Sequence, residues 1–221
     1  MSTVSNAPAD GFKIGPNQTL VCLGDSITQN SVGYCPMIAA LIAASYPDRN
    51  IRVVNAGIGG NKIPDLLARL DRDVLSHRPD WVTVSVGIND VWHGLNDGGK
   101  SGVPLGTYRE GLAELTDRLV ASGANVVLLP PTVIGEDLSS AGNVALRDYR
   151  AAVHAIAASR GLLIAPTDTD LDTALVANLP TVGGEPGKTL TSDGVHLRPA
   201  GDAVLAAAVL KTLGFFSGGA R

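Results

Sequence analysis

Cysteine, aromatic side chains and long apolar runs are all scarce in this sequence. Only 2 of its 221 residues are cysteines, and only 4% are aromatic. Two cysteines cannot form the disulfide framework of a small secreted domain, so we expect Cys22 and Cys35 to be buried thiols in a reducing compartment. Because aromatic residues are so few, the core must be built from Ala, Val, Leu and Ile.

Basic charge is also lacking. The chain has 17 basic and 21 acidic residues, with a net charge of −4 and no run of like charge. Binding to nucleic acid requires a basic surface, which this composition does not supply. The longest apolar stretches, Met37–Ala44 and Ala203–Leu210, are too short to span a bilayer. Residues 1–17 contain no apolar segment typical of signal peptides. We therefore expect a cytoplasmic protein that binds neither nucleic acid nor membrane.

The apolar content indicates one folded domain. A hydrophobic fraction of 45% is incompatible with intrinsic disorder. A chain of this length can bury enough surface to fold without disulfides or metal ions. We predict a domain over residues 18–214, preceded by a flexible extension at residues 1–17 and followed by a tail at residues 215–221.

Short β-branched runs alternate with longer segments of helical period. The runs are Thr19–Leu23, Ile51–Asn55, Trp81–Val86, Asn125–Leu129 and Leu162–Pro166. Apolar runs of this kind are typical of parallel strands buried on both faces. The helical candidates are Gly33–Tyr46, Pro64–His77, Leu105–Ser122, Ala141–Arg160 and Pro199–Leu213. This alternation predicts an α/β fold, a three-layer α/β/α sandwich with a five-stranded parallel sheet.

Residues suited to chemistry gather in four segments, at positions 24–29, 55–61, 87–90 and 193–196. The first three follow predicted strands, and the fourth precedes the last predicted helix. Ligands bind at the carboxyl ends of the strands in sheets of this type. We therefore expect the four segments to meet at one site.

The residue types in these segments fit acyl transfer. A serine nucleophile needs a base, and a histidine base needs an acceptor that holds its tautomer. Ser26 can be the nucleophile, His196 the base and Asp193 the acceptor. Gly60 can bring its backbone N–H to a developing oxyanion because it has no side chain, and Asn89 can donate from its amide.

At these positions the chain resembles the SGNH, or GDSL, hydrolase family, whose four blocks are marked by Ser, Gly, Asn and His. Its serine follows Gly-Asp, as Ser26 does, and its Asp-x-x-His matches Asp193 and His196. Its oxyanion hole of serine N–H, glycine N–H and asparagine amide maps to Ser26, Gly60 and Asn89. The blocks occur in the family's order over nearly the whole chain. The resemblance implies a flavodoxin-like fold and a serine esterase.

Residues 51–55, 79–82 and 87–92 resemble those of carbohydrate acetylesterases, in particular intracellular acetyl-xylan esterases. The implied function is hydrolysis of small acyl esters, acetyl esters of sugars above all, through a Ser-His-Asp triad and an acyl-enzyme intermediate. A short-chain lipase or thioesterase of the same fold is the alternative. No His, Cys and Asp cluster has metal-ligand spacing, so we expect no metal and no cofactor. The sequence determines neither the natural substrate nor the oligomeric state, and a homo-oligomer is compatible with it.

Several site residues also have a purely structural interpretation. Ser26 is a favoured helix N-cap, and Gly60 and Asn89 are common turn residues. The four blocks taken together favour the catalytic interpretation. We interpret Asp25 as an acceptor for loop N–H groups. His154 has no acidic neighbour in sequence, and we interpret it as a structural helix residue.

A second Asp-x-x-His pair competes for the role of base. Asp90 and His93 have the spacing of Asp193 and His196 and also follow a strand end, so spacing alone does not separate the pairs. The family resemblance selects His196, because the family's histidine precedes the final helix. Trp92 and His93 are then interpreted as pocket wall, with simple surface placement as the alternative.

Residues 94–101 match the nucleotide-binding pattern G-x-x-x-x-G-K-[ST] letter for letter. A P-loop needs a strand directly before it and a helix directly after it. Here the preceding strand ends too early, and Ser101 is followed by Gly102, Val103 and Pro104. We therefore predict a Gly-rich loop that binds no nucleotide.

An inactive carbohydrate-binding module is a further functional class to consider. Such a module would lack at least one catalytic residue, and none is missing from the four segments.

Overall fold

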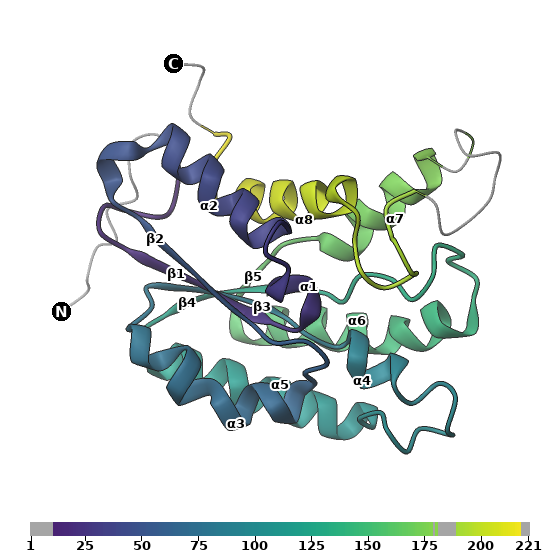
Figure 1. Ribbon diagram of the computed structural model, residues 1–221. Coiled ribbons are helices and arrows are strands. Elements are labelled where there is room, and N and C mark those ends of the chain that lie inside the picture. Colours follow the sequence, from purple (N-terminus) through teal and green to yellow (C-terminus); the bar gives the residue numbers. More distant parts are fainter. Residues whose placement is uncertain (1–10, 179, 181–188, 218–221) are drawn as a thin grey trace.

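Five parallel strands form the central sheet of the computed structural model, which describes residues 11–178, 180 and 189–217 (Figure 1). They are β1 (Thr19–Gly24), β2 (Arg52–Gly57), β3 (Trp81–Ser85), β4 (Asn125–Leu129) and β5 (Leu163–Ile164). The strand order is β2-β1-β3-β4-β5, and each neighbouring pair is parallel. The predicted α/β class with a five-stranded parallel sheet is confirmed.

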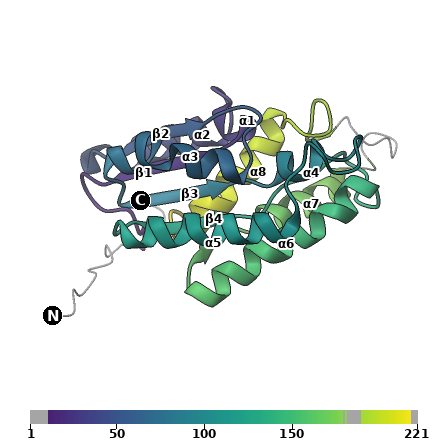
Figure 2. The ribbon, with the colours of Figure 1, turned by 90° about the horizontal axis from the view of Figure 1, so that it is seen from below.

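Helices cover both faces of this sheet (Figure 1, Figure 2). On one face lie α2 (Tyr34–Ser45), α7 (Thr167–Asn178) and α8 (Pro199–Thr212), and on the other lie α3 (Ile63–Asp73), α5 (Leu105–Ala121) and α6 (Ala141–Arg160). Each face has its own cluster of buried, mostly aliphatic side chains. The sheet is therefore the middle layer of a three-layer sandwich. No helix of the described residues is long and apolar enough to cross a membrane.

Helix boundaries follow residue types that favour helix ends. Ser140 caps α6 by accepting a hydrogen bond from the Asn143 N–H, and Gly161 ends the helix in the left-handed region. Pro64 and Pro199 occupy the first turns of α3 and α8, where the missing N–H costs nothing. These local signals explain why the predicted helix bounds agree closely with the observed ones.

Two elements differ from the sequence prediction, the strand β2 and the helix α7. The edge strand β2 is partly exposed, whereas β1 and β3 are buried along their whole length. An edge strand has a neighbour on one side only, so full burial was the wrong expectation for it. The helix α7 was not predicted, because its acidic and threonine residues obscure the buried positions 167, 168, 171 and 175.

Part of the predicted extension at residues 1–17 packs against the domain. Phe12 and Ile14 are fully buried. The Phe12 ring stacks on Tyr46 at a centroid distance of 4.8 Å and meets the edge of Phe215 at 5.4 Å. The packed unit therefore includes residues on both sides of the predicted bounds 18 and 214. Residues 1–10 and 218–221 lie outside the described residues.

The strand order reverses at β1, because β2 and β3 lie on its two sides. Loops that follow the strands on either side of such a reversal diverge and leave a crevice at the carboxyl edge of the sheet. Two short helices stand at this edge, α1 (Ser26–Gln29) after β1 and α4 (Ile88–Trp92) after β3. The topology thus brings Ser26 and Asn89 to the same edge.

Candidate active site

Ser26 is the first residue of α1, in a sharp turn directly after β1. Asp25 caps this helix, since its Oδ1 accepts the Ile27 N–H at 3.0 Å, in agreement with its structural interpretation. Burial raises the pKa of Asp25 to about 6, although the Ile27 hydrogen bond opposes this shift. The turn packs tightly on β2, where a Cβ on Gly57 would lie 2.2 Å from the Gln29 nitrogen. Only glycine at this position lets the turn approach so closely.

His196 and Asp193 complete a hydrogen-bonded chain with Ser26. The His196 Nε2 lies 3.0 Å from the Ser26 Oγ, and the His196 Nδ1 lies 2.7 Å from the Asp193 Oδ2. The other carboxylate oxygen, Oδ1, accepts the backbone N–H groups of Val195 at 3.0 Å and His196 at 2.8 Å. The backbone therefore fixes the carboxylate, and the carboxylate orients the imidazole.

The charge of Asp193 follows from these contacts. Burial favours its neutral form, but hydrogen bonds from the His196 ring and from the backbone N–H groups of His196 and Val195 outweigh burial. Together they lower the pKa of Asp193 to about 2. Its carboxylate is therefore ionised at neutral pH. The side chains of His196 and Asp193 remain 42% and 51% exposed, so the chain of groups lies at an open surface.

Of the other residues predicted for the oxyanion hole, Gly60 lies on the loop after β2 and Asn89 lies in α4, the short helix after β3. A Cβ on Gly59 would lie 3.8 Å from the Ser26 Cβ, which places the loop after β2 next to the serine. Gly60 has a φ of +75°, a backbone conformation that favours glycine. Asn89 is buried in α4, and its Nδ2 donates to the Asn61 carbonyl at 3.0 Å. That bond ties the loop after β2 to α4.

Residues 22–204 match the GDSL-like lipase/acylhydrolase family. The chain belongs to this family. It is a carboxylic ester hydrolase, as the sequence resemblance implied.

Relatives within the family are similar over most of the chain. An acetylxylan esterase from Geobacillus stearothermophilus is 32% identical over 220 residues, which cover 92% of this chain and 97% of that protein. The crystal structure of Axe2, an acetylxylan esterase from the same species, matches with a TM-score of 0.85 at 31% identity and covers 95% of this chain and 100% of that chain. An arylesterase from Vibrio mimicus is 30% identical over 119 residues, 51% of this chain and 54% of that protein.

Three further structures of Axe2 are catalytic mutants, in which alanine replaces a serine, an aspartate or a histidine. The aspartate and the histidine of Axe2 stand three positions apart in its sequence. Asp193 and His196 of this esterase have the same separation.

The competing pair, Asp90 and His93, does not form a second chain of this kind in the esterase. The Asp90 Oδ1 accepts the Ile63 N–H at the start of α3, at 3.0 Å. Its Oδ2 is buried and has no hydrogen-bond partner among the described residues. Burial raises the pKa of Asp90 to about 7, so this carboxyl group is a poor partner for an imidazole at neutral pH.

Trp92 lies beside His196, and His93 lies beside Gly60. The Trp92 ring meets the His196 ring edge to face, with 6.5 Å between centroids. A Cβ on Gly60 would lie 4.0 Å from the His93 Cε1. Desolvation and the nearby Lys62 charge lower the pKa of His93. These positions are compatible with a pocket wall, and that role stays a prediction.

Two other interpretations from the sequence can be compared with the structure. Residues 94–101 form turns, and the next helix, α5, begins only at Leu105, so the helix that a P-loop requires is missing from this segment. His154 lies in α6, as predicted, and has an acidic partner that is not close to it in sequence. Its Nε2 lies 3.0 Å from the Oδ2 of Asp168, a residue of α7. The pairing was missed because α7 itself was not predicted.

Sequence reasoning also missed Arg69, a buried residue of α3 that joins the loops of the site. Its guanidinium donates to the carbonyls of Gly24 and Ala56, both at 2.9 Å, and to the Asn61 Oδ1 at 2.7 Å. The guanidinium thus ties the end of β1 to the loop that carries Gly60. A cation on the otherwise apolar buried stripe of α3 was the available signal.

Proposed function

We propose that this esterase hydrolyses small acyl esters, with acetyl esters of carbohydrates as the leading substrates, through a Ser26-His196-Asp193 triad. The observation that carries the proposal is the continuous chain of contacts, 3.0 Å from Ser26 Oγ to His196 Nε2 and 2.7 Å from His196 Nδ1 to Asp193 Oδ2. These distances are those that a serine nucleophile, its base and the orienting acceptor require.

The reaction follows from the charge of each group. The ionised Asp193 accepts a hydrogen bond from the His196 Nδ1–H and so holds the proton on Nδ1, which leaves the Nε2 lone pair free to accept the Ser26 hydroxyl proton. The Ser26 oxygen attacks the acyl carbon, and His196 then passes the proton to the departing alcohol. Water hydrolyses the acyl-enzyme, again with His196 as base.

The oxyanion of each tetrahedral intermediate is stabilised by three donors, the N–H groups of Ser26 and Gly60 and the side-chain amide of Asn89. Such donors act only where charge develops, so they lower the barrier without tightening substrate binding. The bond from Asn89 to the Asn61 carbonyl uses one amide hydrogen and leaves the second for the oxyanion.

Replacement of Asn89 by alanine is expected to lower kcat about 10²–10³-fold and to change KM little. The reason is that the amide is aligned with the transition state rather than with the bound ester. Steady-state kinetics on a soluble acetyl ester measure both constants. Asn125→Ala is the matched control, because Asn125 also donates its amide to a carbonyl but stands at the amino end of β4. A change in KM alone would make Asn89 a substrate-binding residue.

The preference for acetylated carbohydrates rests on two observations. Relatives that match nearly the whole chain include acetylxylan esterases. The side chains of His196 and Asp193 are also about half exposed, which suits a bulky, polar alcohol better than a long acyl chain that must be shielded from water.

Hydrolysis rates on esters from acetyl to dodecanoyl, on acyl thioesters and on acetylated xylo-oligosaccharides test this preference. We expect kcat/KM to be highest for acetyl esters and to fall as the acyl chain lengthens, with acetate released from the oligosaccharides. The Ser26→Ala variant gives the background rate for every substrate. Rates that rise with chain length, together with no release of acetate from the oligosaccharides, would favour a lipase or thioesterase instead.

A further inference from the structure

Glu136 is a buried carboxylate on the loop between β4 and α6, and only 2% of its surface is exposed. Its Oε1 accepts the N–H groups of Leu190 at 2.8 Å and Thr191 at 2.6 Å, and the Thr191 hydroxyl at 2.9 Å. Its Oε2 accepts the N–H group of Thr189 at 3.1 Å and the Thr189 hydroxyl at 2.6 Å. One side chain thus holds three consecutive residues of a distant segment.

The segment that Glu136 holds leads directly into the Asp193–His196 turn. Thr191 pairs with Leu197 across the turn in an antiparallel bridge, and the Ser192 N–H donates to the His196 carbonyl at 2.9 Å. The tip of the turn is also attached to the same loop, because the Gly135 N–H donates to the Gly194 carbonyl at 2.6 Å. Both the base and the tip of the turn are therefore anchored on residues 135–136.

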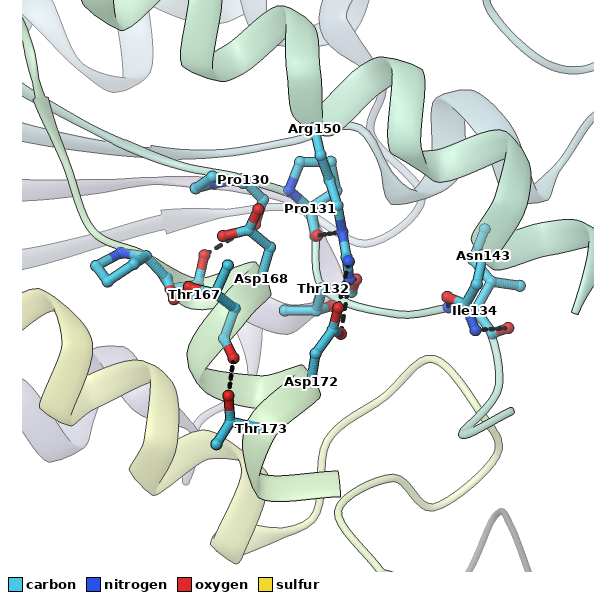
Figure 3. A network of polar contacts seen from close by, with 12 residues as sticks. Pro130, Pro131, Thr132, Ile134, Asn143, Arg150, Thr167, Asp168, Asp172 and Thr173 are labelled. Carbon is cyan, nitrogen blue, oxygen red and sulfur yellow. Dashed lines mark hydrogen bonds and ion pairs between the residues drawn. The ribbon is translucent and has the colours of Figure 1, made fainter. Parts of the chain in front are cut away.

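The loop that carries Glu136 is itself held from two helices (Figure 3). From α6, the Asn143 side chain accepts the Ile134 N–H at 2.9 Å and donates to the Gly135 carbonyl at 2.9 Å. Further along α6, Arg150 donates to the Pro131 carbonyl at 2.9 Å and pairs with Asp172 of α7 at 2.7 Å. The loop between the sheet and the turn is thus held by contacts along its length.

The contacts of Glu136 with residues 189–191 require a carboxylate. All five contacts are donated to it, and a carboxylate can accept at both oxygens. Burial favours the neutral form, but the hydrogen bonds from Thr189 and Thr191 outweigh burial and lower the pKa of Glu136 to about 2. A glutamine in its place would turn an NH₂ group toward N–H and O–H donors.

We propose that Glu136 is a positioning residue for the catalytic base, which acts by anchoring residues 189–191 and so fixing the place of Asp193 and His196 relative to Ser26. This inference rests on the proposed triad. The five contacts with residues 189–191 include no side chain of the triad. Its effect on the reaction is transmitted through the backbone that leads into the turn.

Glu136→Gln tests the proposal, with Asp80→Asn as the matched control. Asp80 also accepts a backbone N–H, that of Thr19 at 2.8 Å, but it lies at the amino end of the sheet. Displacement of a catalytic group by about 1 Å can cost up to about 10²-fold in rate, so we expect Glu136→Gln to lower kcat by about 10–10²-fold. KM should change little, and Asp80→Asn should leave kcat unchanged.

Two measurements separate positioning from a general loss of folding. Rates are expressed per active site, counted by mass spectrometry after complete labelling with a serine-directed phosphonate. The proton NMR signal of the His196 Nδ1–H, identified by its absence in His196→Ala, reports the bond to Asp193. We expect this downfield signal to shift or broaden in Glu136→Gln but not in Asp80→Asn.

A smaller change covers the case in which Glu136→Gln does not fold. Thr191→Val removes one hydroxyl donor to the carboxylate and keeps the side-chain shape and the backbone contacts. We expect a several-fold loss in kcat from Thr191→Val, and a larger loss when Thr189→Val is added.

The proposal is overturned if Glu136→Gln changes neither kcat per labelled site nor the NMR signal. If Glu136→Gln does not fold, the same result in the Thr189→Val, Thr191→Val double variant overturns it. Failure of the proposed function has a different signature, because the phosphonate would then not label Ser26 in the unmodified enzyme and Ser26→Ala would remain active.

Discussion

Replacement of Ser26 by alanine is expected to reduce ester hydrolysis by on the order of 10⁴–10⁶-fold while the fold is retained. The loss is large because no other group in the triad can form the acyl-enzyme, and triad members act as a unit. The fold should persist because α1 is capped by Asp25 and not by the Ser26 hydroxyl. Steady-state rates on an acetyl ester measure the loss, and thermal unfolding checks the fold.

A serine-directed phosphonate provides a second measurement on the same variant. The unmodified enzyme should be labelled at Ser26 alone, and Ser26→Ala should not be labelled. Ser31→Ala is the control, because Ser31 is an exposed serine just beyond α1. Labelling at a different serine, with activity retained in Ser26→Ala, would rule out Ser26 as the nucleophile.

Replacement of His196 by alanine should be nearly as damaging as Ser26→Ala, and the double variant should be little worse than either single one. Removing the base leaves the serine hydroxyl protonated, so both changes abolish the same step. Asp193→Asn should also be severe, because an amide can present an N–H to the Nδ1 and favour the wrong imidazole tautomer. Kinetics of all four variants on one acetyl ester give the comparison.

His93→Ala is the matched control for the base. His93 lies beside Gly60 and is not bonded to Ser26, so its loss should affect substrate preference or KM and leave most of the turnover. An inactive His93→Ala combined with an active His196→Ala would assign the base to the Asp90–His93 pair. It would also contradict the resemblance to the family at Asp193 and His196, which match the family's Asp-x-x-His.

Local sequence patterns determined the fold class and the region of the site. The predicted strand Asn125–Leu129 and the predicted helix Ala141–Arg160 coincide with β4 and α6. Both elements are set by short-range properties. The strand is an apolar run, and the helix has Ser140 and Gly161 at its ends. Parallel strands place their carboxyl ends at one edge, so the convergence of segments after β1, β2 and β3 also followed from the sequence.

Segments without a regular apolar pattern were not predicted. The helix α7 contains acidic and threonine residues at buried positions, among them Thr167 and Asp168, and periodicity cannot identify such a helix. The burial of Phe12 likewise depends on Tyr46 and Phe215, which are remote in sequence. Composition near a chain end does not reveal a contact of that kind.

Residue spacing did not decide which histidine meets Ser26: the family resemblance favoured His196, and the contact itself is seen only in the tertiary structure. Two Asp-x-x-His pairs have the same spacing, but His196 approaches the serine from 170 positions away, whereas Asp90 bonds to the Ile63 N–H. The contacts of Glu136 with residues 189–191 likewise span 53 to 55 positions. The sequence by itself determined the fold class and the residue types available at the carboxyl edge, because strand and helix patterns are local. Pairing between particular side chains depends on how distant segments pack, and that leaves no regular spacing in the sequence.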